Sequence, residues 1–85
     1  MPRFYFNIDD GLSTLDVEGT EIGSLAEARC QAIKMAGHIM CEAAGTFWDH
    51  HSEWIMTVTD EQRLTMFTLQ ICGTDAPATR HRPLP

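Results

Sequence analysis

The chain has 85 residues, 44% of them hydrophobic, and its formal net charge at pH 7 is −6. This length supports one modest hydrophobic core, which usually gains further stability from a disulfide, a bound metal or a partner subunit. Residues 1–75 contain all twelve acidic residues but only four Lys or Arg, a net charge of −8. Because phosphate binding depends on clustered basic residues, we expect no general binding to nucleic acid or anionic membranes.

The three cysteines, Cys30, Cys41 and Cys72, argue against a disulfide framework because their number is odd. Cys30 and Cys41 fall eleven positions apart in one predicted helix, and such a separation spans about 16 Å, beyond the reach of a disulfide. The start of the chain lacks the apolar stretch of a signal peptide, and no run approaches the ~20 apolar residues of a membrane span. We therefore expect a reduced, cytoplasmic protein without a membrane segment.

The N-terminal residues predict a β-hairpin. Apolar and polar residues alternate over 3–8, the period of a half-buried strand. The Asp and Gly residues over 9–11 predict a turn, because they tolerate positive φ angles. Leu15 and Val17 then alternate with acidic residues, which predicts a short second strand over 15–18 whose charges suit a sheet edge.

A long helix is predicted to begin at Ser24. Ser24 and Glu27 have the spacing of a capping box, in which both side chains accept hydrogen bonds from unpaired N–H groups. Small and apolar residues then recur at intervals of three and four: Leu25, Ala28, Ala32, Ala36, Ile39 and Ala43. Because most of them are alanines, the helix can lie close to the surface that it covers. Gly45 is the predicted end of the helix.

Two further strands are predicted after the helix. A connection over 46–52 leads to alternating residues over 53–59, then a hairpin loop over 60–63 and a fourth strand over 64–71. Residues 73–85 contain three prolines and few apolar side chains. We therefore expect a disordered or loosely attached C-terminal tail.

Together these elements predict a single α+β domain over 1–72 with the order ββαββ. One long helix would pack on one face of a four-stranded antiparallel or mixed sheet. The residues expected to face the helix are Phe4, Phe6, Trp54, Met56, Val58, Phe67, Leu69 and Ile71.

The open face of the predicted sheet would still carry apolar side chains, namely Tyr5, Ile55, Leu64 and Met66. An exposed patch of this kind is typical of an interface. We therefore predict a homodimer that forms through the open face or through a sheet edge, since small cores commonly need such support. The alternative is a monomer in which a loop or the tail covers the patch.

Several motifs occur in an order typical of one protein family. They are the opening Met1-Pro-Arg-Phe-Tyr-Phe-Asn-Ile-Asp-Asp-Gly11, then Asp16-Val-Glu-Gly-Thr-Glu21, Leu25-Ala-Glu-Ala-Arg29, and the strand from Trp54 to Asp60. Over residues 1–72 the chain resembles a family of short bacterial proteins, common in rhizobia and their alphaproteobacterial relatives, that is described as a domain of unknown function. It departs from the family pattern at Gln70 and Ile71, where Pro-Phe is usual, and in its His-His connection and its cysteines. The resemblance supports the ββαββ order and implies no activity.

A shorter stretch resembles the N-terminal domains of HicB-type antitoxins, which also run from a strand pair through a glycine-containing loop into a capped helix. This likeness rests on Asp10-Gly11, Glu18-Gly19 and residues 24–28. It implies an antitoxin-type domain as an alternative. Such antitoxins generally add a DNA-binding segment, for which this chain has no room.

The candidates for metal ligands are His38 and Cys41 in the helix and His50 and His51 in the connection after it. Zinc accepts these residue types. Their spacing matches no established motif, however, and adjacent histidines in an extended segment point apart. We therefore predict exposed histidines and no metal or other cofactor.

Catalysis is not predicted, although Cys41 with His38 as its base resembles a nucleophile pair. An orienting third group and an oxyanion loop are not evident, and a free cysteine is usually a small buried hydrophobe. We predict a non-enzymatic module for protein interaction or regulation that acts through the open sheet face. The alternative is a binder of a small ligand or metal that uses the helix end and the loop over 47–51.

Overall fold

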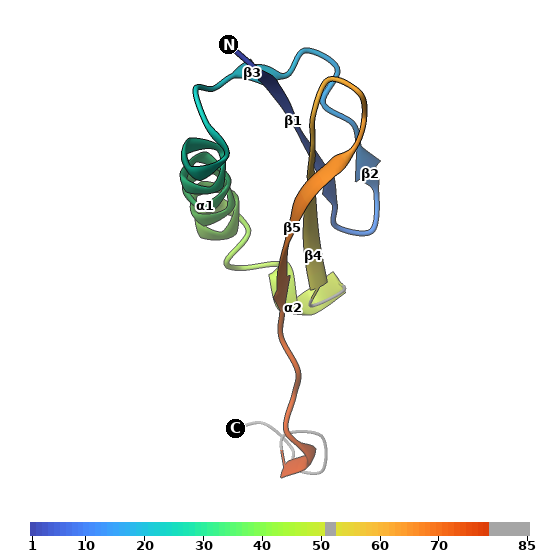
Figure 1. The fold of residues 1–85 in the computed structure, drawn as a ribbon. Helices are drawn as coiled ribbons and strands as arrows, with labels where there is room; N and C mark the ends of the chain where they lie inside the picture. Colours follow the sequence, from blue (N-terminus) through green and yellow to red (C-terminus); the bar gives the residue numbers. More distant parts are fainter. Residues whose placement is uncertain (51–52, 79–85) are drawn as a thin grey trace.

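The computed structural model describes residues 1–50 and 53–78 as one antiparallel sheet, one long helix and one short helix (Figure 1). The strands are β1 (Arg3–Asp9), β2 (Ser13–Thr14), β3 (Thr20–Glu21), β4 (Glu53–Thr59) and β5 (Thr65–Cys72). The helices are α1 (Leu25–Glu42) and α2 (Phe47–His50). The predicted α+β class is confirmed, with α1 on one face of the sheet.

The sheet has the order β2-β1-β4-β5, and β3 also pairs with β1. Because β4 occupies the other side of β1, β2 and β3 share one edge of that strand. Ile8 lies opposite Thr14 of β2, and Arg3 lies opposite Glu21 of β3. The pairing of β4 with β5 contains an irregularity at Val58 and Thr59, and it leaves Met66 as the extra residue of a bulge.

The predicted second strand over 15–18 is wrong, since β2 ends before it and β3 begins after it. The reason is the side chain of Asp16, which accepts a hydrogen bond from the backbone N–H of Phe6. This N–H would otherwise bond to a neighbouring strand. Residues 15–19, here called the Asp16 loop, therefore leave the sheet, and the four expected strands become five.

Helix α1 begins as the sequence predicts. Ser24 is the N-cap, and its hydroxyl accepts a hydrogen bond of 3.2 Å from the backbone N–H of Glu27. The carboxylate of Glu27 accepts one from the backbone N–H of Gly23. The helix ends earlier than Gly45, with Ala43 as its C-cap. The predicted connection that follows contains α2.

The core lies between α1 and the two central strands. Its buried residues are Phe4, Phe6, Ile22, Ala28, Ala32, Ala36, Trp54, Met56 and Val58. The buried side of α1 in this core consists of three alanines, Ala28, Ala32 and Ala36. The predicted inward residues of β1 and β4 are confirmed. Those of β5 are only half-buried, because one helix does not cover the full width of the sheet.

Beyond β5 the described part of the C-terminal segment, residues 73–78, leads away from the sheet (Figure 1). The rest of the predicted tail lies outside the described residues. The loop over 60–63 is confirmed, and the carboxylate of Asp60 accepts hydrogen bonds from Gln62 and Leu64 there. Within 1–50 and 53–78, no helix combines the length and apolar character that crossing a bilayer requires.

Candidate interaction site

The Asp16 loop is held against β1 by the side chain of one residue. One carboxylate oxygen of Asp16 accepts the Phe6 N–H at 3.1 Å, and the other accepts the N–H groups of Glu18 at 3.2 Å and Gly19 at 3.0 Å. The backbone N–H of Asp16 donates in turn to the side-chain oxygen of Asn7 at 3.0 Å. A single aspartate thus closes the loop on itself and attaches it to the sheet.

Asn7 and Arg3 secure the two sides of this attachment. The amide nitrogen of Asn7 donates to the carbonyl of Thr57 on β4, so the contact extends across β1 into the sheet. The guanidinium of Arg3 donates to the carbonyl of Glu18 at 2.9 Å and forms an ion pair with Glu21 at 3.0 Å. The loop is therefore tied both to the sheet interior and to the end of β3.

Gly19 is required by the backbone at the end of the loop. Its φ angle is +70°, a region that only glycine adopts without strain. A Cβ atom there would lie 2.8 Å from Cγ of Arg3 and 2.9 Å from Cε2 of Tyr5. The loop packs so closely on β1 that no side chain fits between them.

This attachment turns the neighbours of Asp16 outward. Leu15 and Val17 are 71% and 85% exposed, and Leu12 in the preceding turn is 80% exposed. In a monomeric domain, large aliphatic side chains usually find a place in the core, and clustered exposed ones mark contact sites. Here a framework of hydrogen bonds holds them in water.

A groove of about 340 Å³ lies between the Asp16 loop and the face of the sheet opposite α1. Its apolar wall comes from Tyr5, Leu15 and Val17, and its charged end from Glu61 and Arg63 in the β4–β5 loop. Leu15 and Val17 therefore border a depression whose lining also includes the polar residues Asn7 and Thr59. The groove joins the loop to the open face that the sequence analysis singled out.

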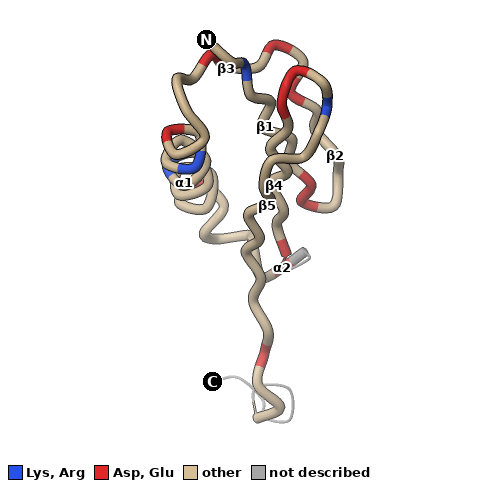
Figure 2. Tube along the Cα trace, in the orientation of Figure 1, with Lys and Arg blue, Asp and Glu red and all other residues tan. Residues whose placement is uncertain are grey.

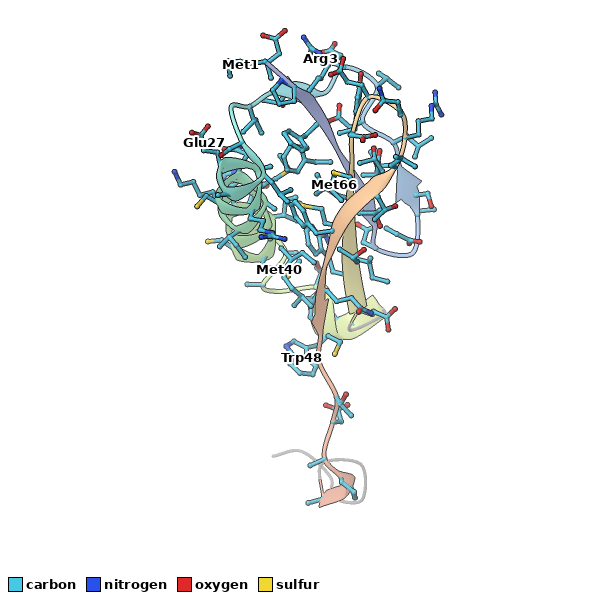
Figure 3. The ribbon with its side chains drawn as sticks, in the orientation of Figure 1. Met1, Arg3, Glu27, Met40, Trp48 and Met66 are labelled. Carbon is cyan, nitrogen blue, oxygen red and sulfur yellow. The ribbon has the colours of Figure 1, made fainter. Side chains whose placement is uncertain are left out.

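Of the four predicted interface residues, Tyr5 and Ile55 belong to the face of the sheet opposite the core. Tyr5 and Ile55 are half-buried and lie two rows apart, because the row of Asn7, Thr57 and Thr68 separates them. Leu64 precedes β5 and is 59% exposed, and Met66, labelled in Figure 3, is the bulge residue. Of the four, only Tyr5 lines the groove.

The predicted metal candidates do not converge in the part of the chain that the structure describes. His38 lies on the exposed side of α1, where its imidazole is 3.3 Å from the carboxylate of Glu42. Cys41 is also exposed. Among the side chains that the structure describes, those of residues 1–49 and 53–78, no three of His, Cys, Asp or Glu form a metal-binding group. The side chains of His50 and His51 lie outside the described residues.

The expectation that the cysteines are small buried hydrophobes is wrong. Cys30, Cys41 and Cys72 are all free and all exposed. Cys30 and Cys41 occupy positions of α1 that face away from its alanine stripe, and Cys72 ends the edge strand β5. Their exposure therefore follows from their places on the uncovered side of α1 and at the sheet edge.

The two tryptophans have different surroundings. Trp54 is 2% exposed and belongs to the core as predicted, whereas Trp48 is 58% exposed at the end of the sheet, beside β5 (Figure 3). Its ring packs so closely against Gly73 that a Cβ atom at this position would overlap with it. The indole N–H of Trp54 has no hydrogen-bond partner within the described part of the chain. A hollow of about 100 Å³ beside it is lined by Met40, Phe47 and residues at the end of α1.

The exposure of Leu15 and Val17 was not predicted, because their alternation with acidic residues resembled a strand, and Leu12 was not identified from the sequence. The signal that could have identified them is the sequence Asp16-Val-Glu-Gly19. An aspartate followed by glycine three residues later favours a side-chain-capped turn over a strand.

The comparisons with known proteins agree with the resemblance seen in the sequence. A family model described as a domain of unknown function, DUF6894, matches residues 3–72. This range contains the whole sheet, α1 and the Asp16 loop. Neither a curated protein nor a solved structure matches the chain.

Proposed function

The chain belongs to the DUF6894 family of domains of unknown function, and we propose that it is a non-enzymatic protein-interaction module. Its contact surface comprises the Asp16 loop, Leu12 and the groove beside Tyr5. The observation that carries this proposal is the exposure of Leu15 and Val17 on a loop fixed by the hydrogen bonds of Asp16.

A fixed loop favours binding because little conformational entropy is lost when a partner docks. The five hydrogen bonds made by Asp16 and Asn7 order the loop before any partner arrives. The exposed leucine and valine then supply apolar area that a partner can cover. The partner is therefore expected to offer an apolar side chain to the groove and polar groups to Glu61 and Arg63.

The absence of a catalytic role is part of the same proposal. Among residues 1–49 and 53–78, whose burial the structure describes, no polar or charged residue is buried, whereas catalytic groups commonly occupy desolvated sites. The imidazole of His38 pairs with Glu42 on the surface of α1. The alternative of an antitoxin-type domain, implied by the likeness to HicB-type antitoxins, stays a prediction.

Site-specific photo-cross-linking in the organism of origin tests the contact surface. A photoreactive residue at Val17 is expected to form a discrete adduct with one protein, and Leu15→Ser should reduce its yield. The same residue at Gln31, which is exposed on α1, provides the control and should give no adduct of that mass. Equal labelling from both positions would contradict the proposed surface.

A second candidate function, the binding of a small ligand near the end of α1, is favoured by one observation. The buried indole N–H of Trp54 has no acceptor among the described residues, and a buried donor without a partner is costly. The adjacent hollow of about 100 Å³ has room for a few non-hydrogen atoms. A carbonyl or carboxylate oxygen of a small molecule would satisfy this donor.

The indole N–H resonance of Trp54 in a nitrogen-15 NMR spectrum tests this second candidate. Acetamide, acetate and similar small acceptors can be titrated, and Trp48→Phe assigns the resonance by elimination. Saturable shifts of the Trp54 signal, with no shift of the Trp48 signal, would support the ligand site. Linear drifts of both signals would exclude it.

A further inference from the structure

The two edges of the sheet differ in whether other parts of the chain cover them. On one side, β2, β3 and the Asp16 loop cover the edge of β1. On the other side, β5 has no neighbouring strand in the described part of the chain. From Leu64 to Thr74 the sequence contains neither a charged residue nor a proline. Natural edge strands usually carry such residues because these prevent pairing with another chain.

The backbone groups that face the open edge can be identified from the pairing. The Phe6 N–H faces Asp16, so the residues that alternate with it on β1, including Tyr5 and Asn7, turn their backbone groups toward β4. The same alternation continues through β4 to β5. The backbone groups of Phe67, Leu69 and Ile71 therefore form the hydrogen bonds to β4. The outward-facing backbone groups therefore belong to Thr68, Gln70 and Cys72.

The helix-side face of β5 is incompletely covered. Phe67, Leu69 and Ile71 are only half-buried, although they point to the same side as the core. The guanidinium of Arg29 lies over the Phe67 ring at 5.9 Å, which identifies the side of α1 that faces β5. Ile33, one helical turn further along that side, is 60% exposed. An apolar strip thus runs along the open edge.

We propose that β5 pairs in an antiparallel manner with β5 of a second copy, so that two sheets become one and both copies of α1 lie on the same face. This interface is separate from the Asp16 loop and does not depend on the proposed function. It defines the surface of the predicted homodimer, which the sequence analysis assigned either to the open face or to an edge.

The distribution of charge favours β5 as the contact between two copies of this chain. Each chain carries a net charge of −6, so most approaches of two copies bring acidic residues together. Figure 2 shows acidic residues around β2, β3 and the β4–β5 loop, whereas β5 has none. Two-fold pairing of β5 joins the uncharged surfaces and places the half-buried apolar residues of both copies side by side.

Sedimentation equilibrium of the full chain and two variants tests the interface. The wild type should reach twice the 9.6 kDa of one chain as its concentration rises through the micromolar range. Gln70→Pro removes an outward N–H that the monomer does not use, and it should raise the dissociation constant at least about tenfold. Thr57→Lys, which adds a charge to the centre of the open face, should leave the dimer unchanged.

A monomeric wild type would overturn the proposal, and so would a dimer that Thr57→Lys disrupts and Gln70→Pro does not. Amide hydrogen exchange provides a second measurement that does not depend on the folding of a variant. At high concentration the amides of Thr68, Gln70 and Cys72 should exchange slowly, and dilution should accelerate them. Fast exchange at every concentration, with Leu69 protected throughout, would show that the edge is free.

Discussion

The carboxylate of Asp16 accepts the backbone N–H of Phe6 at 3.1 Å, so a side chain replaces a neighbouring strand at this point of β1. The same carboxylate caps the turn that contains Glu18 and Gly19. One residue therefore protects a sheet edge, ends a strand and exposes Leu15 and Val17.

Asp16→Ala should lower the free energy of unfolding by about 2 to 3 kcal/mol, because it leaves the partly buried Phe6 N–H without an acceptor. Urea unfolding at one fixed protein concentration measures this change. Asp10→Ala is the matched control, since among the described residues the Asp10 carboxylate accepts one exposed hydrogen bond, from Leu12. Its effect should stay below about 0.5 kcal/mol. Equal effects of the two substitutions would refute the role assigned to Asp16.

Gly19→Ala and Gly37→Ala should change stability in opposite directions. Gly19 has a φ angle of +70° and no space for a Cβ, so its substitution should cost about 1 to 3 kcal/mol. Gly37 lies in α1, and its Cβ would meet nothing within 4 Å. Alanine there should stabilise the protein by about 0.5 to 1 kcal/mol through its higher helix propensity. Thermal unfolding of both variants checks the signs, and a stabilised Gly19→Ala variant would contradict the structure.

Enlarging the alanine stripe of α1 should separate the helix from the sheet. Ala32 is 1% exposed, so Ala32→Leu forces new volume into a filled core and should cost about 1 to 3 kcal/mol or more. Ala26→Leu, at an exposed position of the same helix, should stay within about 0.5 kcal/mol of the wild type. Chemical unfolding followed by circular dichroism distinguishes the two. The packing described for α1 would be untenable if Ala32→Leu were as stable as the wild type.

All three cysteines should react in the folded protein. Cys30, Cys41 and Cys72 are free and exposed, so a thiol reagent such as dithiobis-nitrobenzoate reaches them without unfolding. Titration without denaturant should therefore release three equivalents of chromophore per chain, the same number as in denaturant. A lower number in the native protein would mean that at least one cysteine is buried.

Much of the fold follows from local patterns in the sequence. The capping residues Ser24 and Glu27 fix the start of α1 through contacts within four residues. The alternation of apolar and polar residues predicts the strands β1, β4 and β5. It also predicts that Phe6, Met56 and Val58 belong to the core, because successive side chains of a strand point to opposite faces.

The tertiary structure decided what these patterns could not. Leu15 and Val17 alternate with acidic residues as in a strand, yet they are exposed. The reason is that the Asp16 carboxylate between them accepts a hydrogen bond from the Phe6 N–H, ten residues away in the sequence. Phe67 has the pattern of a core residue but is half-buried, because α1 lies over β1 and β4 and leaves β5 at the edge. Local periodicity determines which side a residue faces. Whether another element covers that side depends on contacts between distant segments, and for this protein these contacts define both proposed interaction surfaces.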